Sequence, residues 1–93
     1  SSLAYLTRLP ISALKIDRSF VRGADESPEA VSIVRAVIDM AHNMRFTVVA
    51  EGVETEWQAK LLRLYHCDQA QGYLFGRPAP AAEVEARLAK AGG

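Results

Sequence analysis

The spacing of apolar residues changes repeatedly along the chain, from two-residue alternation to steps of three and four residues. Strand-like character is expected in three stretches, residues 13–17, 47–51 and 69–75. In the first stretch Leu14 and Ile16 would lie on one face of a strand. Lys15 and Asp17 would lie on the opposite face. The alternation therefore predicts a strand with one apolar and one polar side.

The second predicted strand runs directly into a carboxylate and then a glycine. Val48 and Ala50 would lie on one face of this strand, and Glu51 on the other. Because Gly52 frees the backbone just after Glu51, we expect the chain to leave the sheet at that point. A charged side chain would then stand at the carboxyl end of a buried strand.

Helical spacing separates the predicted strands. Helices are expected over residues 1–9, 28–45, 56–65 and 81–91. The longest has Ser27 at its N-cap and Pro28 in its first turn. Thr55 and Gln58 have the pattern of a capping box at the start of the next helix. These signals fix where the two central helices begin.

The apolar positions of the two central helices predict which sides face the sheet. The longest helix has an apolar stripe at Val31, Val34, Ile38, Ala41 and Met44. The following helix has an apolar stripe at Trp57, Leu61, Leu64 and Tyr65. We interpret Trp57 as a core residue. Residues 18–26 are expected to be a polar loop, and residues 76–80 a loop whose two prolines cannot donate to a ladder.

Strands that alternate with helices indicate an α/β protein with a parallel sheet and right-handed crossovers. The chain has 93 residues, a formal net charge of zero and 49% hydrophobic residues, which suits one globular domain or part of one. It starts at Ser1 with no initiator methionine and no helix cap, so we expect a piece of a longer molecule.

Composition excludes several classes of protein. No run of about 18 apolar residues is present, so we expect no membrane span in this segment. Basic residues are scattered among acidic ones, which argues against binding to a nucleic-acid polymer. Cys67 is the single cysteine, so it forms no internal disulfide and is interpreted as a buried thiol in a cytoplasmic protein. His42 and His66 have no ligand spacing and are interpreted as surface or packing residues.

Polar side chains stand at or near the carboxyl ends of all three predicted strands: Lys15 and Asp17, then Glu51, then Gln71. In a parallel sheet these ends share one edge, and in a curved sheet the four side chains would gather at the mouth of a barrel. Opposite charges placed so closely indicate either a structural ion pair or a functional site. The spacing alone leaves both interpretations open.

Three stretches resemble successive motifs of the EAL domain, a family that hydrolyses cyclic di-GMP to linear pGpG. They are residues 14–21 (LKIDRSFV), 48–55 (VVAEGVET) and 71–78 (QGYLFGRP). The resemblance covers nearly the whole chain, so residues 1–93 are interpreted as the C-terminal portion of such a domain. It implies a (β/α)₈ barrel of the TIM type, of which this chain would supply only the last three βα units.

The resemblance also implies roles for individual residues. Lys15 would orient the attacking water and the phosphate, and Asp17 would hold Lys15. Glu51 would bind a metal and stabilise the nucleophile. Substrate-binding residues would be Gln71, Tyr73, Phe75, Arg77 and Pro78.

The same resemblance predicts what this chain lacks. The Glu-Ala-Leu signature and the loop aspartates of the family are not in the sequence, so Glu51 would be one ligand of a partial set whose other members lie upstream of Ser1. The complete domain would use Mg²⁺ or Mn²⁺, whereas this chain alone is expected to bind neither and to be inactive. Its partners would be cyclic di-GMP and the missing N-terminal half of the barrel, with self-association through open sheet edges. The alternative is a sensor or regulatory domain that binds the nucleotide without cleaving it.

Overall fold

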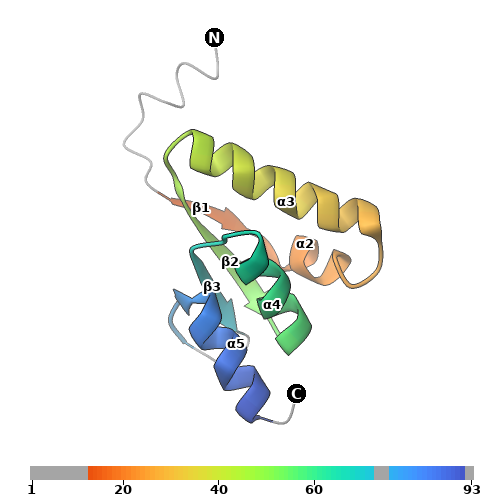
Figure 1. Cartoon of the computed structure of the whole chain (residues 1–93), viewed down its shortest axis with the longest axis vertical. Helices are drawn as coiled ribbons and strands as arrows, with labels where there is room; N and C mark the ends of the chain where they lie inside the picture. Colours follow the sequence, from red (N-terminus) through yellow and green to blue (C-terminus); the bar gives the residue numbers. More distant parts are fainter. Residues whose placement is uncertain (1–12, 73–75, 92–93) are drawn as a thin grey trace.

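The computed structural model describes residues 13–72 and 76–91, which form one sheet covered by helices on one side. The helix expected over residues 1–9, with Ser1 at its start, lies outside the described residues, as do Tyr73 and Phe75. The strands are β1 (Ala13–Ile16), β2 (Thr47–Val53), β3 (Gln69–Gly72) and β4 (Ala79–Pro80). The helices are α2 (Arg18–Gly23), α3 (Pro28–Asn43), α4 (Glu56–Leu64) and α5 (Ala81–Lys90). Figure 1 shows their arrangement.

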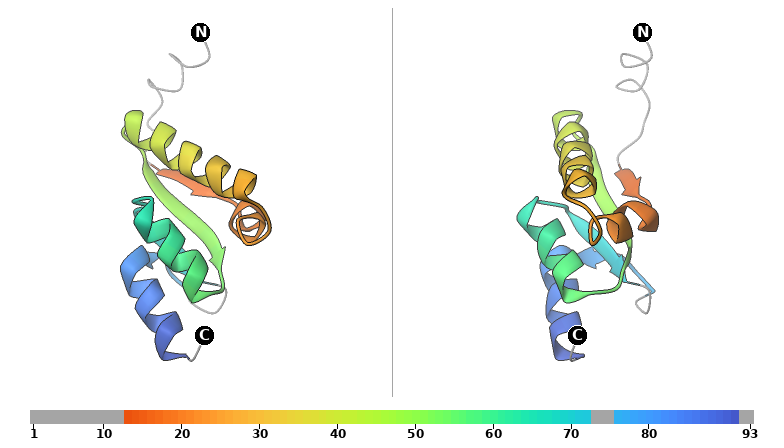
Figure 2. Two further views of the ribbon diagram at one scale, coloured as in Figure 1. Left: turned by 45° about the vertical axis from the view of Figure 1, so that its right-hand side comes forward. Right: turned by 90° about the vertical axis from the view of Figure 1, so that its right-hand side faces the viewer.

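The sheet has the strand order β1-β2-β3-β4. The first three strands are parallel, as the alternation of strands and helices predicted, and α3 and α4 make the crossovers between them. Figure 2 shows α3, α4 and α5 on the same side of the sheet, whereas the short α2 lies beside the carboxyl ends of β1 and β2. Most of the other face therefore has no helix over it. The fold is therefore a partial α/β sheet with one covered and one open face.

The core lies between the sheet and these helices. Ile16, Val48, Ala50 and Ala70 face it from the strands, and Leu14 packs against it as a half-buried residue. The helices contribute Val34, Ile38, Ala41, Ala59, Leu62 and Val84. Burying a valine, leucine or isoleucine side chain stabilises a fold by about 1.5–3 kcal/mol relative to leaving it exposed. The centre of the predicted stripe of α3, Val34 to Ala41, is confirmed, whereas Val31 and Met44 at its ends are only half-buried. The predicted inner faces of β1 and β2 are also confirmed.

Two of the predicted helix starts are also confirmed. The Ser27 hydroxyl accepts from the Ala30 amide at 3.1 Å, with Pro28 in the first turn of α3. The Thr55 hydroxyl accepts from the Gln58 amide at 3.1 Å, and the Gln58 side chain bonds back to the Thr55 amide. Such caps satisfy amides that have no partner within the helix.

The predicted loop over residues 18–26 is wrong, because residues 18–23 form the helix α2. The Asp17 carboxylate caps this helix, and Val21 is buried beneath it. A helix of six residues buries so little of its surface that its sequence shows almost no apolar period. The polar residues that suggested a loop lie on its exposed side.

The predicted apolar stripe of α4 is wrong at Trp57 and Leu64, although Tyr65 packs against the core as predicted. Trp57 is 48% exposed and Leu64 is 53% exposed, whereas Gln58, Ala59 and Leu62 are buried. The face that packs inward is therefore rotated by about one residue from the predicted face. It carries the small Ala59 and a glutamine whose polar atoms are all used in hydrogen bonds.

Strand ends differ from the prediction at two places. The strand β2 continues beyond Glu51 to Val53, with an irregular register after Glu51. The Ala79–Pro80 pair, predicted to be part of a loop, forms the antiparallel β4 opposite Gln69 and Ala70. A proline is tolerated there because β4 pairs with another strand on one side only, so the missing N–H of Pro80 removes no hydrogen bond from the sheet.

Candidate functional site

The helix-free face of the sheet carries the polar residues of the three parallel strands. Lys15 pairs in register with Val49, and Glu51 pairs with Gln71. Ile16 and Ala50 point into the core. Because successive side chains of a strand point to opposite faces, Lys15, Glu51 and Gln71 lie on the other face of the sheet. Lys15 is exposed, and Glu51 and Gln71 are half-buried. The structure thus brings these three predicted site residues onto one surface.

Asp17 has a different partner from the one that the sequence suggested. Its carboxylate accepts from the Ser19 amide at 3.0 Å and from the Ser19 hydroxyl at 2.6 Å. These hydrogen bonds hold the pKa of Asp17 below its usual value, and the bond from the Ser19 hydroxyl has the larger effect. Among the described residues Asp17 forms no ion pair with Lys15. Asp17 therefore fixes the backbone at the end of β1 instead of binding the lysine.

The backbone just after Glu51 is held tightly. Gly52 has φ +69°, and a Cβ placed on it would lie 2.4 Å from the Cβ of Arg18. Only glycine fits such a close approach in a left-handed conformation. The register of β2 against β3 shifts between Glu51 and Val53, as in a β-bulge. Bulges of this kind redirect side chains and are common beside active sites.

Gln58 is a supporting residue that the sequence reasoning missed beyond its capping role. Its side-chain oxygen accepts from the Glu54 amide at 2.8 Å and from the Thr55 amide at 3.3 Å. Its side-chain nitrogen donates to Asp25 at 2.7 Å. The capping box signalled the first contact, but no local pattern signals a partner 33 positions away.

The loop that follows β3 is connected to the candidate site through Gln71. The Gln71 side chain donates to the carbonyl of Gly76 at 3.3 Å. Arg77 and Pro78 are exposed. The two remaining predicted substrate contacts, Tyr73 and Phe75, belong to the residues that the structure does not describe.

The opposite ends of the strands are held by a structural cluster. Asp68 accepts from the Val48 amide at 2.7 Å and lies 2.8 Å from His42 Nε2. The Cys67 thiol donates to the Gln69 carbonyl at 3.3 Å, and burial raises the pKa of Cys67 to about 11. A thiol with so high a pKa stays neutral at pH 7 and is a poor nucleophile. Cys67 is the buried thiol that the sequence predicted, and His42 is a partly exposed residue of α3 whose ring bonds to Asp68.

The described residues do not make a complete metal site. Residues 13–72 and 76–91 contain no group of three or more histidine, cysteine or acidic side chains that could hold an ion. Glu51 offers one carboxylate and Gln71 one amide beside it, while Asp17 is engaged by Ser19. Mg²⁺ takes six ligands and Ca²⁺ six to eight, mostly oxygen atoms. This set fits a partial site and not a whole one, and the location of the other ligands upstream of Ser1 stays a prediction.

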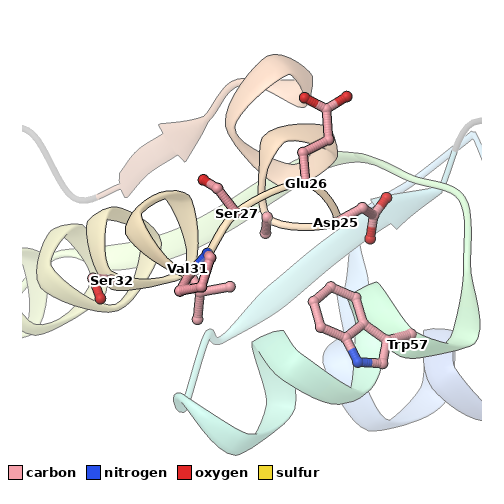
Figure 3. Close-up of a pocket in the computed structure, with 8 residues that line it drawn as sticks. Asp25, Glu26, Ser27, Val31, Ser32 and Trp57 are labelled. Atoms are coloured by element: carbon pink, nitrogen blue, oxygen red, sulfur yellow. The ribbon is translucent and has the colours of Figure 1, made fainter.

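A surface hollow of about 530 Å³ lies elsewhere on the molecule, between the loop before α3 and the start of α4. Asp25, Val31 and Trp57 are among its lining residues, and none of the predicted site residues is. Figure 3 shows Asp25 on the side of the loop that faces Trp57, whereas Glu26 points away from it.

No helix of the described part of the chain is long and apolar enough to cross a membrane.

This α/β sheet, with a carboxylate paired to an amide at the end of its central parallel strands, matches a known family. The family model described as EAL domain matches residues 1–78, and the chain belongs to that family. A protein of Pseudomonas aeruginosa named cyclic di-GMP phosphodiesterase NbdA is 53% identical over 85 residues. These cover 91% of this chain and 11% of NbdA, so the chain spans about a tenth of that relative.

Solved structures of relatives share the fold. The complex of the phosphodiesterase PaMucR with cyclic di-GMP is 44% identical, with a TM-score of 0.74 over 90% of this chain and 34% of that one. A complex of Klebsiella pneumoniae BlrP1 with calcium and cyclic di-GMP is 36% identical, with a TM-score of 0.67 over 87% of this chain and 21% of that one. The EAL relatives thus include structures with the nucleotide and with a divalent cation.

Proposed function

We propose that residues 1–93 are the C-terminal portion of an EAL domain that hydrolyses cyclic di-GMP to linear pGpG in bacterial signalling. The observation that carries the proposal is the pairing of Glu51 with Gln71 on the helix-free face. Both residues stand within the stretches that resemble family motifs. The name of NbdA as a cyclic di-GMP phosphodiesterase supports the same reaction.

In this proposal the chain supplies the last three βα units of a barrel. The helix-free face would be the barrel interior, which fits the polar side chains of Lys15, Glu51 and Gln71 on it. Lys15 would orient the attacking water and the phosphate, and Glu51 would stabilise the nucleophile. Asp17 would act indirectly, because its bonds to Ser19 set the backbone direction at the end of β1.

The proposed reaction requires a divalent cation, Mg²⁺ or Mn²⁺, of which Glu51 would be one ligand. Such an ion neutralises charge on the phosphoryl oxygens of a phosphodiester. The remaining ligands would come from residues upstream of Ser1, because the described residues hold no complete set. The calcium-containing complex of BlrP1 supports a divalent ion in this family. We expect this chain alone to bind no ion firmly and to be inactive.

Substrate contacts are proposed for the loop after β3. Tyr73, Phe75, Arg77 and Pro78 would border a guanine of the nucleotide. The hydrogen bond from Gln71 to the Gly76 carbonyl supports this arrangement, because it ties the base of the loop to the strand that faces Glu51. A nucleotide second messenger of this kind implies a cytoplasmic location.

The edge next to β1 is proposed as the contact with the missing N-terminal half of the barrel, or with a second copy of the chain. An apolar hollow of about 250 Å³ runs along this edge. Its lining includes Leu14, Phe20, Ile33, Val37 and Met40. Phe20 and Met40 are each 50% exposed, and an open strand edge invites pairing. Size-exclusion chromatography of the 93-residue chain should therefore show association, and a monodisperse monomer would contradict this part of the proposal.

A non-catalytic nucleotide sensor is the second candidate. The described residues leave it open, because they hold only part of a ligand set and both functions would bind the same nucleotide. The complete protein that carries these residues distinguishes the two functions, when incubated with cyclic di-GMP and Mg²⁺ or Mn²⁺. Release of pGpG supports the phosphodiesterase, whereas saturable binding without cleavage supports the sensor. If the protein neither binds nor cleaves cyclic di-GMP, both functions are rejected.

A further inference from the structure

Gln58 is the only polar or charged side chain buried among the described residues, at 3% exposure. Its neighbours on α4, Glu56 and Trp57, are half-buried and exposed, so the helix turns this one polar residue inward. A buried amide is costly unless its donors and acceptors are paired. The hydrogen bonds of the Gln58 side chain therefore show which segments of the chain this residue holds together.

Those contacts bridge two loops that are far apart in the sequence. The Gln58 oxygen accepts from the amides of Glu54 and Thr55, which are donors only, so the side-chain nitrogen must face Asp25. Asp25 lies in the loop between α2 and α3. The amide group thus joins that loop to the turn between β2 and α4.

The turn that Gln58 holds starts at Glu54, directly after β2 ends and three residues after Glu51. Only Gly52 and Val53 separate Glu51 from the anchored amide of Glu54, and the register slips across those two residues. The same turn is confined on its other side by Arg18, which contacts Gly52. Arg22 adds a partly exposed ion pair with Glu54 at 3.6 Å, which contributes little by comparison.

We propose that Gln58 is a positioning residue for Glu51, and that through it the direction of the Glu51 carboxylate depends on Asp25. The expected effect on catalysis rests on the proposed function. The structural connection from Asp25 through Gln58 to Glu51 does not. Asp25 also lines the 530 Å³ hollow beside Trp57. Figure 3 shows Asp25 at this hollow. The link would therefore run from an open part of the surface, through Gln58, to the end of the strand that carries Glu51.

The test uses a reversal of the hydrogen bond in the complete protein that carries these residues. Gln58→Glu keeps an acceptor for the Glu54 and Thr55 amides but places a negative charge against Asp25. Adding Asp25→Asn supplies an amide donor to the new carboxylate and restores the bridge. Leu62→Ala serves as the control, because it removes a fully buried side chain from the same helix without touching the bridge.

Two readouts are followed in these variants. One is the carboxyl ¹³C signal of Glu51 in glutamate-labelled protein, assigned from its loss in Glu51→Gln. The other is kcat and KM for cyclic di-GMP. We expect Gln58→Glu to shift the Glu51 signal and to lower kcat by up to about 10²-fold, the effect of a misplaced catalytic group, with KM changed less. The double variant should return the signal to its original position and kcat to within about threefold.

The outcomes separate this inference from the proposed function. If the Glu51 signal stays in place in Gln58→Glu, moves equally in Leu62→Ala, or fails to return in the double variant, Gln58 is only a packing residue. If the protein proves unable to hydrolyse cyclic di-GMP, the carboxyl signal still decides whether Gln58 positions Glu51. A restored signal in an inactive protein would reject the phosphodiesterase and support the link.

Discussion

Glu51 of β2 and Gln71 of β3 are direct partners in a parallel register, and that register slips at the very next residue. A carboxylate and an amide therefore stand side by side where the regular pairing of the sheet ends. Gly52, with φ +69°, lies in the irregular pairing after Glu51, and Thr55 caps α4 a few residues further along. The candidate carboxylate thus lies between the regular part of β2 and the turn that leads into α4.

Losing either charged residue of the candidate site should abolish most hydrolysis. In the complete protein, Glu51→Gln and Lys15→Ala are each expected to lower turnover by about 10²–10³, the usual cost of removing one well-placed electrostatic group. The measurement is Mg²⁺- or Mn²⁺-dependent release of pGpG, with circular dichroism to check folding. Lys60→Ala, an exposed lysine on α4, is the matched control. Near-parental turnover in both site variants would show that the assigned roles are wrong.

Gly52→Ala should destabilise the fold. The alanine would have to adopt φ +69° and would meet Arg18 Cβ at 2.4 Å, a contact that requires the backbone to shift. A left-handed conformation alone costs a non-glycine residue about 1–2 kcal/mol, so a total loss above about 2 kcal/mol is expected. Urea unfolding at fixed protein concentration measures it. Gly76→Ala, with nothing within 4 Å of the new methyl group, should change stability little, and equal effects would refute the packing argument.

The orientation of α4 can be tested with two leucines that are two residues apart and lie on different faces of the helix. Leu62 is 1% exposed, so Leu62→Ala should cost about 2–5 kcal/mol through lost burial and a residual cavity. Leu64 is 53% exposed, and Leu64→Ala should stay within about 0.5 kcal/mol of the parent. Both are measured by thermal or urea unfolding. A larger loss at Leu64 would restore the face that the sequence pattern suggested.

Acid should selectively weaken the cluster around Asp68. Burial favours the protonated form, but hydrogen bonds from the Val48 amide and from His42 outweigh it and lower the pKa of Asp68 below its usual 3.8. Because the pKa is lower in the folded state, the ionised carboxylate stabilises the fold above about pH 4, and this contribution is lost as the pH falls through the folded-state pKa.

The matching experiment compares Asp68→Asn with the parent across pH. At pH 7 the variant should be less stable by about 0.5–1.5 kcal/mol, the net contribution of a typical intramolecular hydrogen bond. The difference should shrink below about pH 4, where Asp68 of the parent also becomes neutral. Asp39→Asn, an exposed carboxylate on α3, provides the control. A difference that stays constant down to about pH 3 would mean that the charge of Asp68 is not the stabilising feature.

The sequence by itself determined the parts of this protein that depend on neighbouring residues. Ser27 and Thr55 cap helices through amides three residues away, and the alternation around Leu14 and Val48 fixes which strand face is buried. These interactions act within one turn or one strand. The motifs around Lys15, Glu51 and Gln71 also indicated the EAL family, because they consist of short uninterrupted stretches.

Tertiary structure decided what depends on residues far apart in the chain. The helix α2 forms where its polar residues suggested a loop, and Trp57 lies at the surface because Ala59 and Leu62 take the inner side of α4. Gln58 reaches Asp25, and Asp17 bonds to Ser19 instead of Lys15. An apolar period shows that a helix has a buried side, but the packing of the whole sheet sets its rotation, and a polar side chain takes whichever partner the fold brings within hydrogen-bond reach.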